Sequence, residues 1–317
     1  MKKLSFYVTA LVASVLASCS NVEDVQTSQN EMEDFVAVVA EGGTRTVLDG
    51  NAVKWDVEDA LAIFRKTGKG INTKYTVKSI AENGSATFGY AGVYSPKENM
   101  PNLSLEKNYA VYPYSENITM TTAGTVDVTI PATQTYTTVT TGSGDANVTT
   151  PTFDPAAAFM FAASDDTDLK FKNAHALLKI ALTKMPGDDH YLITSIKLSS
   201  TTGNLSGAAT IEMDDNDEPE VTISGTGKEL TLNCTNDVEV SSLDVSNPAV
   251  FYLVVTPGTY SDLKLTLTGS NYTKELELPE NLNIARNKIV TIQHTCGSDD
   301  FTGNIPDLYS TGTNVNP

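Results

Sequence analysis

The stretch FVAVVAEGGTRTVLDGNAVKW, residues 35–55, carries the pattern that decides the fold. Its first segment, 35–40, is apolar on both of its alternating faces, as in a strand buried inside a β-sandwich. The pair Asp49-Gly50 favours the positive φ of a tight hairpin turn. Short apolar strands separated by such turns are typical of sandwiches and barrels. The stretch therefore predicts an all-β protein.

The same rhythm of short strands and polar turns continues along the chain. Near the C-terminus, Leu263, Leu265 and Leu267 alternate with polar residues, which predicts a strand with one buried face. The segment 174–182 carries enough apolar residues to form a short helix, which is the alternative to a strand there.

The pattern loosens between residues 131 and 168, where Gly, Ser, Thr and Pro are frequent. Such a stretch marks a long loop or linker rather than a strand. We therefore place a domain boundary near residue 165. The sequence predicts an N-terminal β-sandwich domain at 34–165, a C-terminal one at 166–296, and a loosely ordered tail at 297–317.

The N-terminus has the features of a secretory signal. Two lysines precede an apolar stretch that is too short to span a membrane stably, and small residues lead to Cys19. Residues 16–19, Leu-Ala-Ser-Cys, resemble the lipobox of bacterial lipoproteins, in which the cysteine is lipidated and becomes the first residue. We expect a signal peptide at 1–18, lipidation of Cys19 and a flexible polar tether at 19–33. The alternative is an ordinary signal peptide with an incidental cysteine.

The composition argues against several classes of partner and chemistry. Against 21 Lys and Arg stand 39 Asp and Glu, so a broad basic surface for nucleic acid or anionic lipid is not expected. The three histidines show no metal-ligand spacing, and no G-x-S-x-G occurs. The acidic cluster 214–218 lacks the glycine and distal glutamate of a calcium loop, so a solvated turn is the favoured interpretation. We predict no enzyme activity, no cofactor and no metal site.

Besides the expected lipidated Cys19, the mature chain has two cysteines, Cys234 and Cys296. In an oxidising compartment they could form a disulfide, and two unpaired thiols are the equal alternative. Trp55, the one tryptophan, is expected in the core, with a sugar-binding platform as the alternative.

Three stretches together resemble the fimbrillin-like (type V pilin) proteins of Bacteroides and its relatives. They are RTVLDGNAVKWDVEDALAIF at 45–64, LKFKNAHALLKIALTK at 169–184 and VFYLVVTPGTYSDLKLTLTG at 250–269. The family's usual Gly-Asp reads Glu58-Asp59 here. The resemblance runs from about residue 33 to 294 and implies two tandem transthyretin-like β-sandwich domains.

The resemblance also implies a function. Family members are exported lipoproteins anchored in the outer membrane at the cell surface, and many assemble into fimbriae. In polymerising members, a trypsin-like or arginine-specific protease cuts after the first strand, and a strand from another subunit fills the groove. Arg45, in the glycine-flanked loop, is the candidate cleavage site, and the alternative is an arginine on an exposed strand.

The expected partners are other pilin subunits, the outer membrane through the lipid anchor, a maturation protease and a host or bacterial surface ligand. The sequence does not identify the donor strand. The alternative function is a monomeric outer-membrane lipoprotein that binds glycans or host ligands through loops of the sandwiches.

Overall fold

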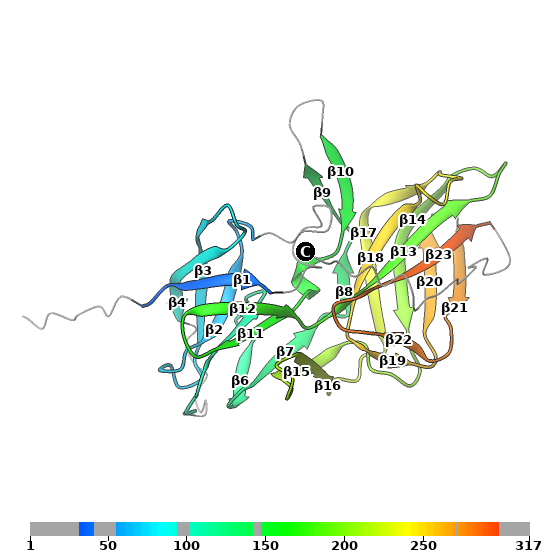
Figure 1. Cartoon of the computed structure of the whole chain (residues 1–317). Coiled ribbons are helices and arrows are strands. Elements are labelled where there is room, and N and C mark those ends of the chain that lie inside the picture. Colours follow the sequence, from blue (N-terminus) through cyan, green and yellow to red (C-terminus); the bar gives the residue numbers. More distant parts are fainter. Residues whose placement is uncertain (1–31, 41–54, 94–101, 142–146, 271, 298–317) are drawn as a thin grey trace, which may run out of the picture. The chain divides into compact units, whose positions relative to one another are not determined.

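The computed structural model describes residues 32–40, 55–93, 102–141, 147–270 and 272–297 (Figure 1). The described chain is almost entirely β, and the helix found in it is the three-residue 3-10 helix η2 (Pro155–Ala157). The prediction of an all-β protein is confirmed. The two tandem transthyretin-like sandwiches stay a prediction.

Seven strands form a closed sheet in the order β1-β12-β11-β5-β2-β3-β4. The strands are β1 (Phe35–Val39), β2 (Ala60–Phe64), β3 (Asn72–Ile80), β4 (Ala86–Val93), β5 (Asn108–Tyr112), β11 (Met160–Ser164) and β12 (Asp168–Asn173). Their inward side chains make one apolar core, which includes Phe35, Trp55, Tyr75, Phe88 and Phe171.

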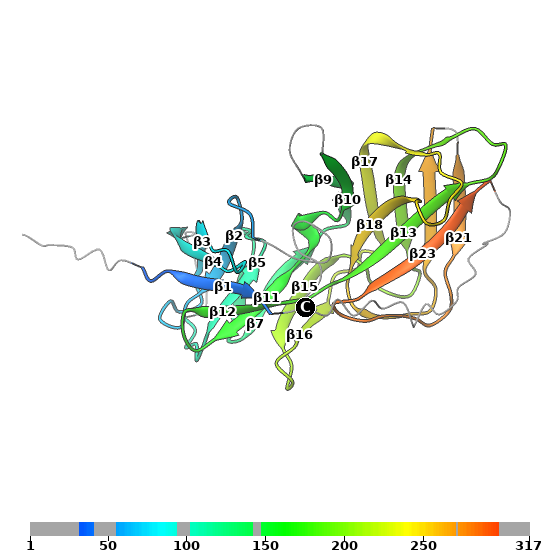
Figure 2. The same cartoon turned by 45° about the horizontal axis from the view of Figure 1, so that its top comes forward.

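A four-stranded sheet packs its apolar side chains against the outer face of this closed sheet. Its strands lie in the order β16-β15-β7-β6, and their bounds are β6 (Thr119–Thr122), β7 (Thr125–Ile130), β15 (Gly207–Met213) and β16 (Pro219–Ile223). Phe64, Val111 and Phe161 of the closed sheet meet Met120 and Ile211 of the four-stranded sheet in a second core. Figure 2 shows β15 and β16 beside β7.

A third core lies between two further sheets and contains Leu178, Ile196 and Leu265. The three-stranded sheet has the order β18-β13-β23, with β13 (Ala176–Lys184), β18 (Ala249–Val255) and β23 (Ile289–Cys296). The five-stranded sheet has the order β21-β20-β14-β17-β8, with β8 (Thr133–Thr135), β14 (Tyr191–Ser199), β17 (Glu229–Val240), β20 (Lys264–Gly269) and β21 (Thr273–Glu277). Two short pairs complete the description: β9 (Thr137–Thr141) with β10 (Val148–Thr152), and β19 (Gly258–Tyr260) with β22 (Leu282–Ile284).

The segment 174–182, for which a helix was the alternative, is strand. β13 pairs antiparallel with β18 from Ala176 to Leu182 and parallel with β23 from Leu177 to Lys184. Its alternate side chains Leu178, Ile180 and Leu182 all point into the third core. The helix alternative is wrong because the backbone N–H and C=O groups of this segment pair with two neighbouring strands. Its alternating apolar side chains fit a strand with one face in the core.

Strand pairs cross the boundary that the sequence places near residue 165. β12 follows that boundary but pairs with β1 and β11 in the closed sheet. β15 pairs with β7, and β8 pairs in parallel with β17. Each half of the chain therefore lends strands to a sheet of the other half. The loosened pattern at 131–168 does not mark a clean division because β8 and β11 both lie within it.

Candidate functional site

The first strand, β1, lies between two neighbours in the wall of the closed sheet. It runs parallel to β12, with Ala37 opposite Leu169, and antiparallel to β4, with Ala37 opposite Ala86. At its two ends, the Val36 N–H donates to the carbonyl oxygen of Thr167 and the Ala40 N–H to that of Phe171, both at 2.9 Å. Since β1 completes the closure, its loss would leave unpaired backbone groups on both neighbours.

One face of β1 supplies the buried contacts. Phe35 is 2% exposed and meets the ring of Tyr75 edge to face, with centroids 5.1 Å apart, and Ala37 is fully buried. Val36, on the other face, is 37% exposed. The prediction that both faces of this strand are buried is therefore wrong for the outer face. The strand lies in the wall of a closed sheet rather than between two sheets, so only one face meets a core.

Trp55 holds the middle of this strand from inside. Its indole Nε1 donates to the carbonyl oxygen of Ala37 at 3.1 Å. Its ring makes edge contacts with Phe88, Tyr112 and Phe171 at centroid distances of 5.1–5.6 Å. The ring is 4% exposed, which confirms the core interpretation. The alternative of a sugar-binding platform at Trp55 is wrong because no ring face is open to solvent.

An ion pair lies at the start of β1. The Lys78 ammonium donates to the Asp34 carboxylate at 2.8 Å, and both side chains are largely exposed. A pair in this setting adds at most about 1 kcal/mol. The hold on β1 therefore comes from Phe35, Ala37 and the backbone ladder rather than from charge.

Two predicted site residues fall outside the described residues. Cys19 belongs to 1–31 and Arg45 to 41–54. The structure begins at residue 32, three residues before β1, and describes Ala40 just after it. The predicted lipidation and cleavage sites therefore lie on either side of the described segment 32–40, and both stay predictions.

Cys234 and Cys296 are both free thiols in the structure. Cys234 is half-buried on β17, whereas Cys296 is fully buried at the end of β23. Burial raises the pKa of each thiol to about 11, so both are protonated at neutral pH and react slowly. The disulfide is not formed here and stays a prediction.

The acidic cluster 214–218 forms the turn between β15 and β16. The Asp214 carboxylate accepts hydrogen bonds from the Asn216 and Glu218 N–H groups, both at 2.8 Å. The Glu218 carboxylate pairs with Arg286, and Lys172 donates to the Asp217 carbonyl oxygen at 2.6 Å. These contacts fit the predicted turn, and among the described residues no group of acidic, His or Cys side chains is arranged to hold a metal ion.

Two of the three histidines are buried. Nδ1 of His175 lies 3.0 Å from the Phe159 carbonyl oxygen, and Nε2 of His294 lies 3.0 Å from the Tyr272 hydroxyl. The second ring nitrogen of each is buried without a hydrogen-bond partner. Burial lowers the pKa of each imidazole to about 4, so both are neutral at pH 7 and serve as packed polar groups.

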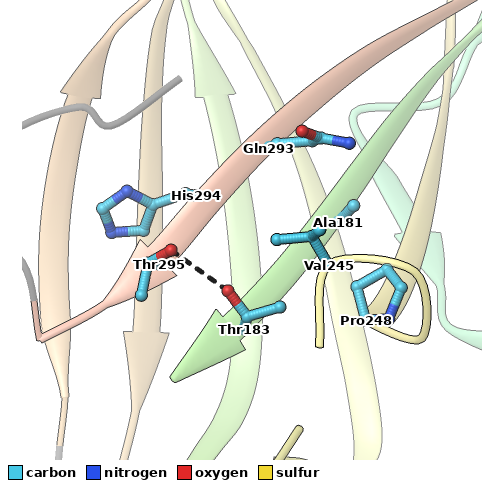
Figure 3. Close-up of a pocket in the computed structure, with 7 residues that line it drawn as sticks. All are labelled: Ala181, Thr183, Val245, Pro248, Gln293, His294 and Thr295. Atoms are coloured by element: carbon cyan, nitrogen blue, oxygen red, sulfur yellow. Dashed lines mark hydrogen bonds between the residues drawn. The ribbon is translucent and has the colours of Figure 1, made fainter. Parts of the chain in front are cut away.

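A small pocket opens on the outer face of the three-stranded sheet (Figure 3). Ala181 and Thr183 of β13 and Gln293 and Thr295 of β23 line one side, and Val245 and Pro248 of the β17–β18 loop line the other. Thr183 and Thr295 share a hydrogen bond of 3.1 Å between their hydroxyl oxygens. His294 also borders the pocket, and no acidic side chain lines it.

The chain is similar in sequence to a curated Bacteroides protein. The relative is the "Putative fimbrium subunit Fim1C" of Bacteroides uniformis, 29% identical over 244 residues that span 74% of this chain and 72% of the relative. The fimbrillin-like resemblance predicted from the sequence is confirmed by this similarity to a named fimbrium subunit. No protein-family model matches this chain.

Two solved structures also align with most of this chain. One is a putative cell adhesion protein from Bacteroides ovatus, 13% identical, with a TM-score of 0.47 over 82% of this chain and 91% of the other. The second, from Bacteroides uniformis and described in the same words, is 16% identical, with a TM-score of 0.47 over 83% and 92%. These TM-scores are too low to transfer a fold or a residue's role.

Sequence reasoning missed the residues that hold β1 from the neighbouring strands. Tyr75 lies under Phe35, and Tyr112 packs on Trp55. Tyr75 lies on β3 and Tyr112 on β5, and periodicity shows which face a residue takes but not which strand it meets. Within the described residues, no helix is long and apolar enough to cross a membrane.

Proposed function

We propose that the chain is a non-enzymatic structural subunit of a fimbria, assembled by strand exchange after its first strand is cut away. The observation that carries the proposal is the position of β1. It is the first described strand, it closes a sheet, and its buried anchors in the core are Phe35 and Ala37, with Val39 partly buried beside them. The similarity to a named fimbrium subunit supports the same role.

The free-energy cost of removing β1 favours its replacement by another strand over its loss without a replacement. Exposing the Phe35 side chain would cost roughly 1.5–3 kcal/mol. The ladders to β4 and β12 would lose their partners as well. A closed sheet that lacks β1 therefore binds another extended segment favourably, which is the strand-addition mode of peptide recognition.

The cut is proposed at Arg45, between β1 and Trp55. We expect an arginine-specific protease to convert the native chain to one that begins at Thr46, as read by N-terminal sequencing. Arg45→Ala should resist both this protease and trypsin at that site. Arg45→Lys should resist the arginine-specific protease but yield to trypsin, which makes it the matched control.

Assembly is tested after the cut. Cleaved protein should form filaments visible by electron microscopy and a ladder on gels run without boiling, whereas Arg45→Ala should stay monomeric. If the native chain is cut only at other sites, or if cut protein that begins at Thr46 stays monomeric, strand exchange at β1 is wrong.

Surface location is proposed through the N-terminus. Residues 1–18 would be removed and Cys19 would carry the lipid that anchors the precursor in the outer membrane. Metabolic labelling with a fatty acid should mark the wild-type protein and not Cys19→Ala. An unlabelled wild-type protein with a different mature N-terminus would contradict the anchor while leaving the fimbrial role intact.

A further inference from the structure

Three exposed apolar side chains gather at one end of the third core. Leu243 and Val245, in the β17–β18 loop, are 56% and 66% exposed, and Met185, just after β13, is also exposed. The Lys184 N–H donates to the Ser242 carbonyl oxygen at 2.9 Å, which fixes the loop beside the end of β13. We call Met185, Leu243 and Val245 the apolar rim.

The apolar rim borders the pocket between the loop and the sheet. Val245 belongs to both, and the floor beneath it is made by Ala181 and the hydrogen-bonded Thr183 and Thr295 (Figure 3). The pocket is small, and its apolar lining comes from Ala181, Val245 and Pro248. Large exposed apolar side chains beside a pocket mark a surface that something covers.

The described chain ends beside this surface. Thr295 lines the pocket, and the carbonyl oxygen of its neighbour Cys296 accepts a hydrogen bond from the Met185 N–H at 3.3 Å. The chain then turns at Gly297, which has a φ of 90°. A Cβ there would lie 2.3 Å from the Asp188 carboxylate and 2.6 Å from the Tyr191 hydroxyl, so this exit requires glycine.

We propose that residues 298–317 fold back and cover the apolar rim of their own subunit, with an aliphatic side chain in the pocket. This segment contains three aliphatic side chains, Ile305, Leu308 and Val315, and the first two lie nearest to Gly297. Ile305 lies eight residues beyond Gly297, a length of chain that spans up to about 26 Å when extended. The segment is therefore long enough to reverse direction and return to Thr295.

The partner is the chain's own C-terminal segment because it leaves the fold at the pocket. A tethered segment of this length has a local concentration near the millimolar range, so even weak contacts hold it in place. The outward-facing amide of Gln293 at the pocket can bond the backbone of the returning segment. Docking would keep the C-terminal segment on its own subunit and shield the exposed loop.

The test compares the full chain with a chain that ends at Gly297. Hydrogen exchange of residues 241–248 should be slower in the full chain than in the shortened one. A synthetic peptide of residues 298–317 should bind the shortened chain and restore the protection. The peptide with Ile305→Ser and Leu308→Ser should bind at least tenfold more weakly.

Matched surface variants locate the binding site. Leu243→Ser with Val245→Ser should weaken peptide binding at least tenfold. Val148→Ser, which replaces a side chain 56% exposed on β10, should leave it unchanged. The proposal would be overturned if residues 241–248 exchanged hydrogen equally fast in the full and shortened chains. It would also be overturned if the peptide bound the Leu243→Ser, Val245→Ser variant as tightly as the Val148→Ser variant. A full chain that dimerises with increasing concentration and loses its loop protection on dilution would show that the segment docks on a second copy instead.

Discussion

The indole of Trp55 donates a 3.1 Å hydrogen bond to the carbonyl oxygen of Ala37, and so ties the core of the closed sheet to the middle of its first strand. The two residues lie on opposite sides of the proposed cut at Arg45. A strand that takes the place of β1 must therefore present a carbonyl oxygen at the same position to satisfy Trp55.

Trp55→Phe should weaken the hold on β1. The smaller ring leaves a cavity and leaves the buried carbonyl of Ala37 without its donor, so the free energy of unfolding should fall by about 2–4 kcal/mol. Urea unfolding followed by circular dichroism measures this change. Val57→Ala, at a 73% exposed side chain two residues away, should change stability by less than about 0.5 kcal/mol.

The two faces of β1 should respond differently to the same added bulk. Ala37→Leu forces a larger side chain into a fully buried position under Trp55 and should cost about 1–3 kcal/mol. Val36→Leu, on the outer face, should be close to neutral. Thermal unfolding of the two variants side by side checks the difference, and equal melting temperatures would contradict the inward orientation of Ala37.

Gln134 should matter more than its place in a three-residue strand suggests. Its buried side-chain amide donates to the Val254 carbonyl oxygen at 2.7 Å and accepts from the Val254 N–H at 2.9 Å, so it takes the place of a strand on the edge of β18. Gln134→Met keeps the side-chain volume but leaves the Val254 N–H and carbonyl groups without these hydrogen bonds. The free energy of unfolding should fall by about 1–3 kcal/mol or more. Thr133→Ala, at an exposed neighbour, serves as the control in the same urea titration.

Stability should fall in mild acid. The pKa of His175 and of His294 lies near 4 in the fold, below the ordinary 6.5, because burial disfavours the charged ring. Arg286 near His175 and Lys274 near His294 act in the same direction. Their contribution is therefore complete above about pH 6.5 and is lost as the pH falls towards 4.

A pair of variants isolates this histidine effect from that of the carboxylates. The urea midpoint measured at steps from pH 7.5 to 4 should fall less steeply for His175→Gln with His294→Asn than for wild type. Parallel slopes for the two proteins would contradict a role for these imidazoles.

The two ends of the described fold should unfold together. β8 belongs to the sheet of β17, and β15 and β16 belong to the sheet of β7, so neither half completes its sheets alone. Trp55 fluorescence reports on the closed sheet, and labelling of Cys296 in a chain with Cys19→Ser and Cys234→Ser reports on the third core. Both probes should give one urea midpoint, and two separated transitions would contradict the coupling.

Part of this architecture could be predicted from the sequence. The apolar run at 35–40 corresponds to β1, and the alternation of Leu265 and Leu267 with polar residues corresponds to β20. Alternation encodes which face a side chain takes, so the buried positions followed from it. It contains no information about which strand lies alongside, so it could not predict that β12 pairs with β1 and β11.

The candidate site was predictable to a similar extent. The first strand and the core position of Trp55 followed from apolar pattern and residue type. The hydrogen bond between Trp55 and Ala37 and the edge contact of Tyr75 with Phe35 depend on three-dimensional closure of the sheet. Local sequence around 35–55 cannot specify either contact.

The exchange of strands between the two halves also constrains the order in which the chain can fold. The polypeptide is synthesised from its N-terminus. The sheet that contains β6 and β7 therefore cannot be completed until Ile223, at the end of β16, has been added. β8 waits likewise for β17, about a hundred residues further on. Neither half of the chain can therefore complete its sheets until most of the polypeptide has been made.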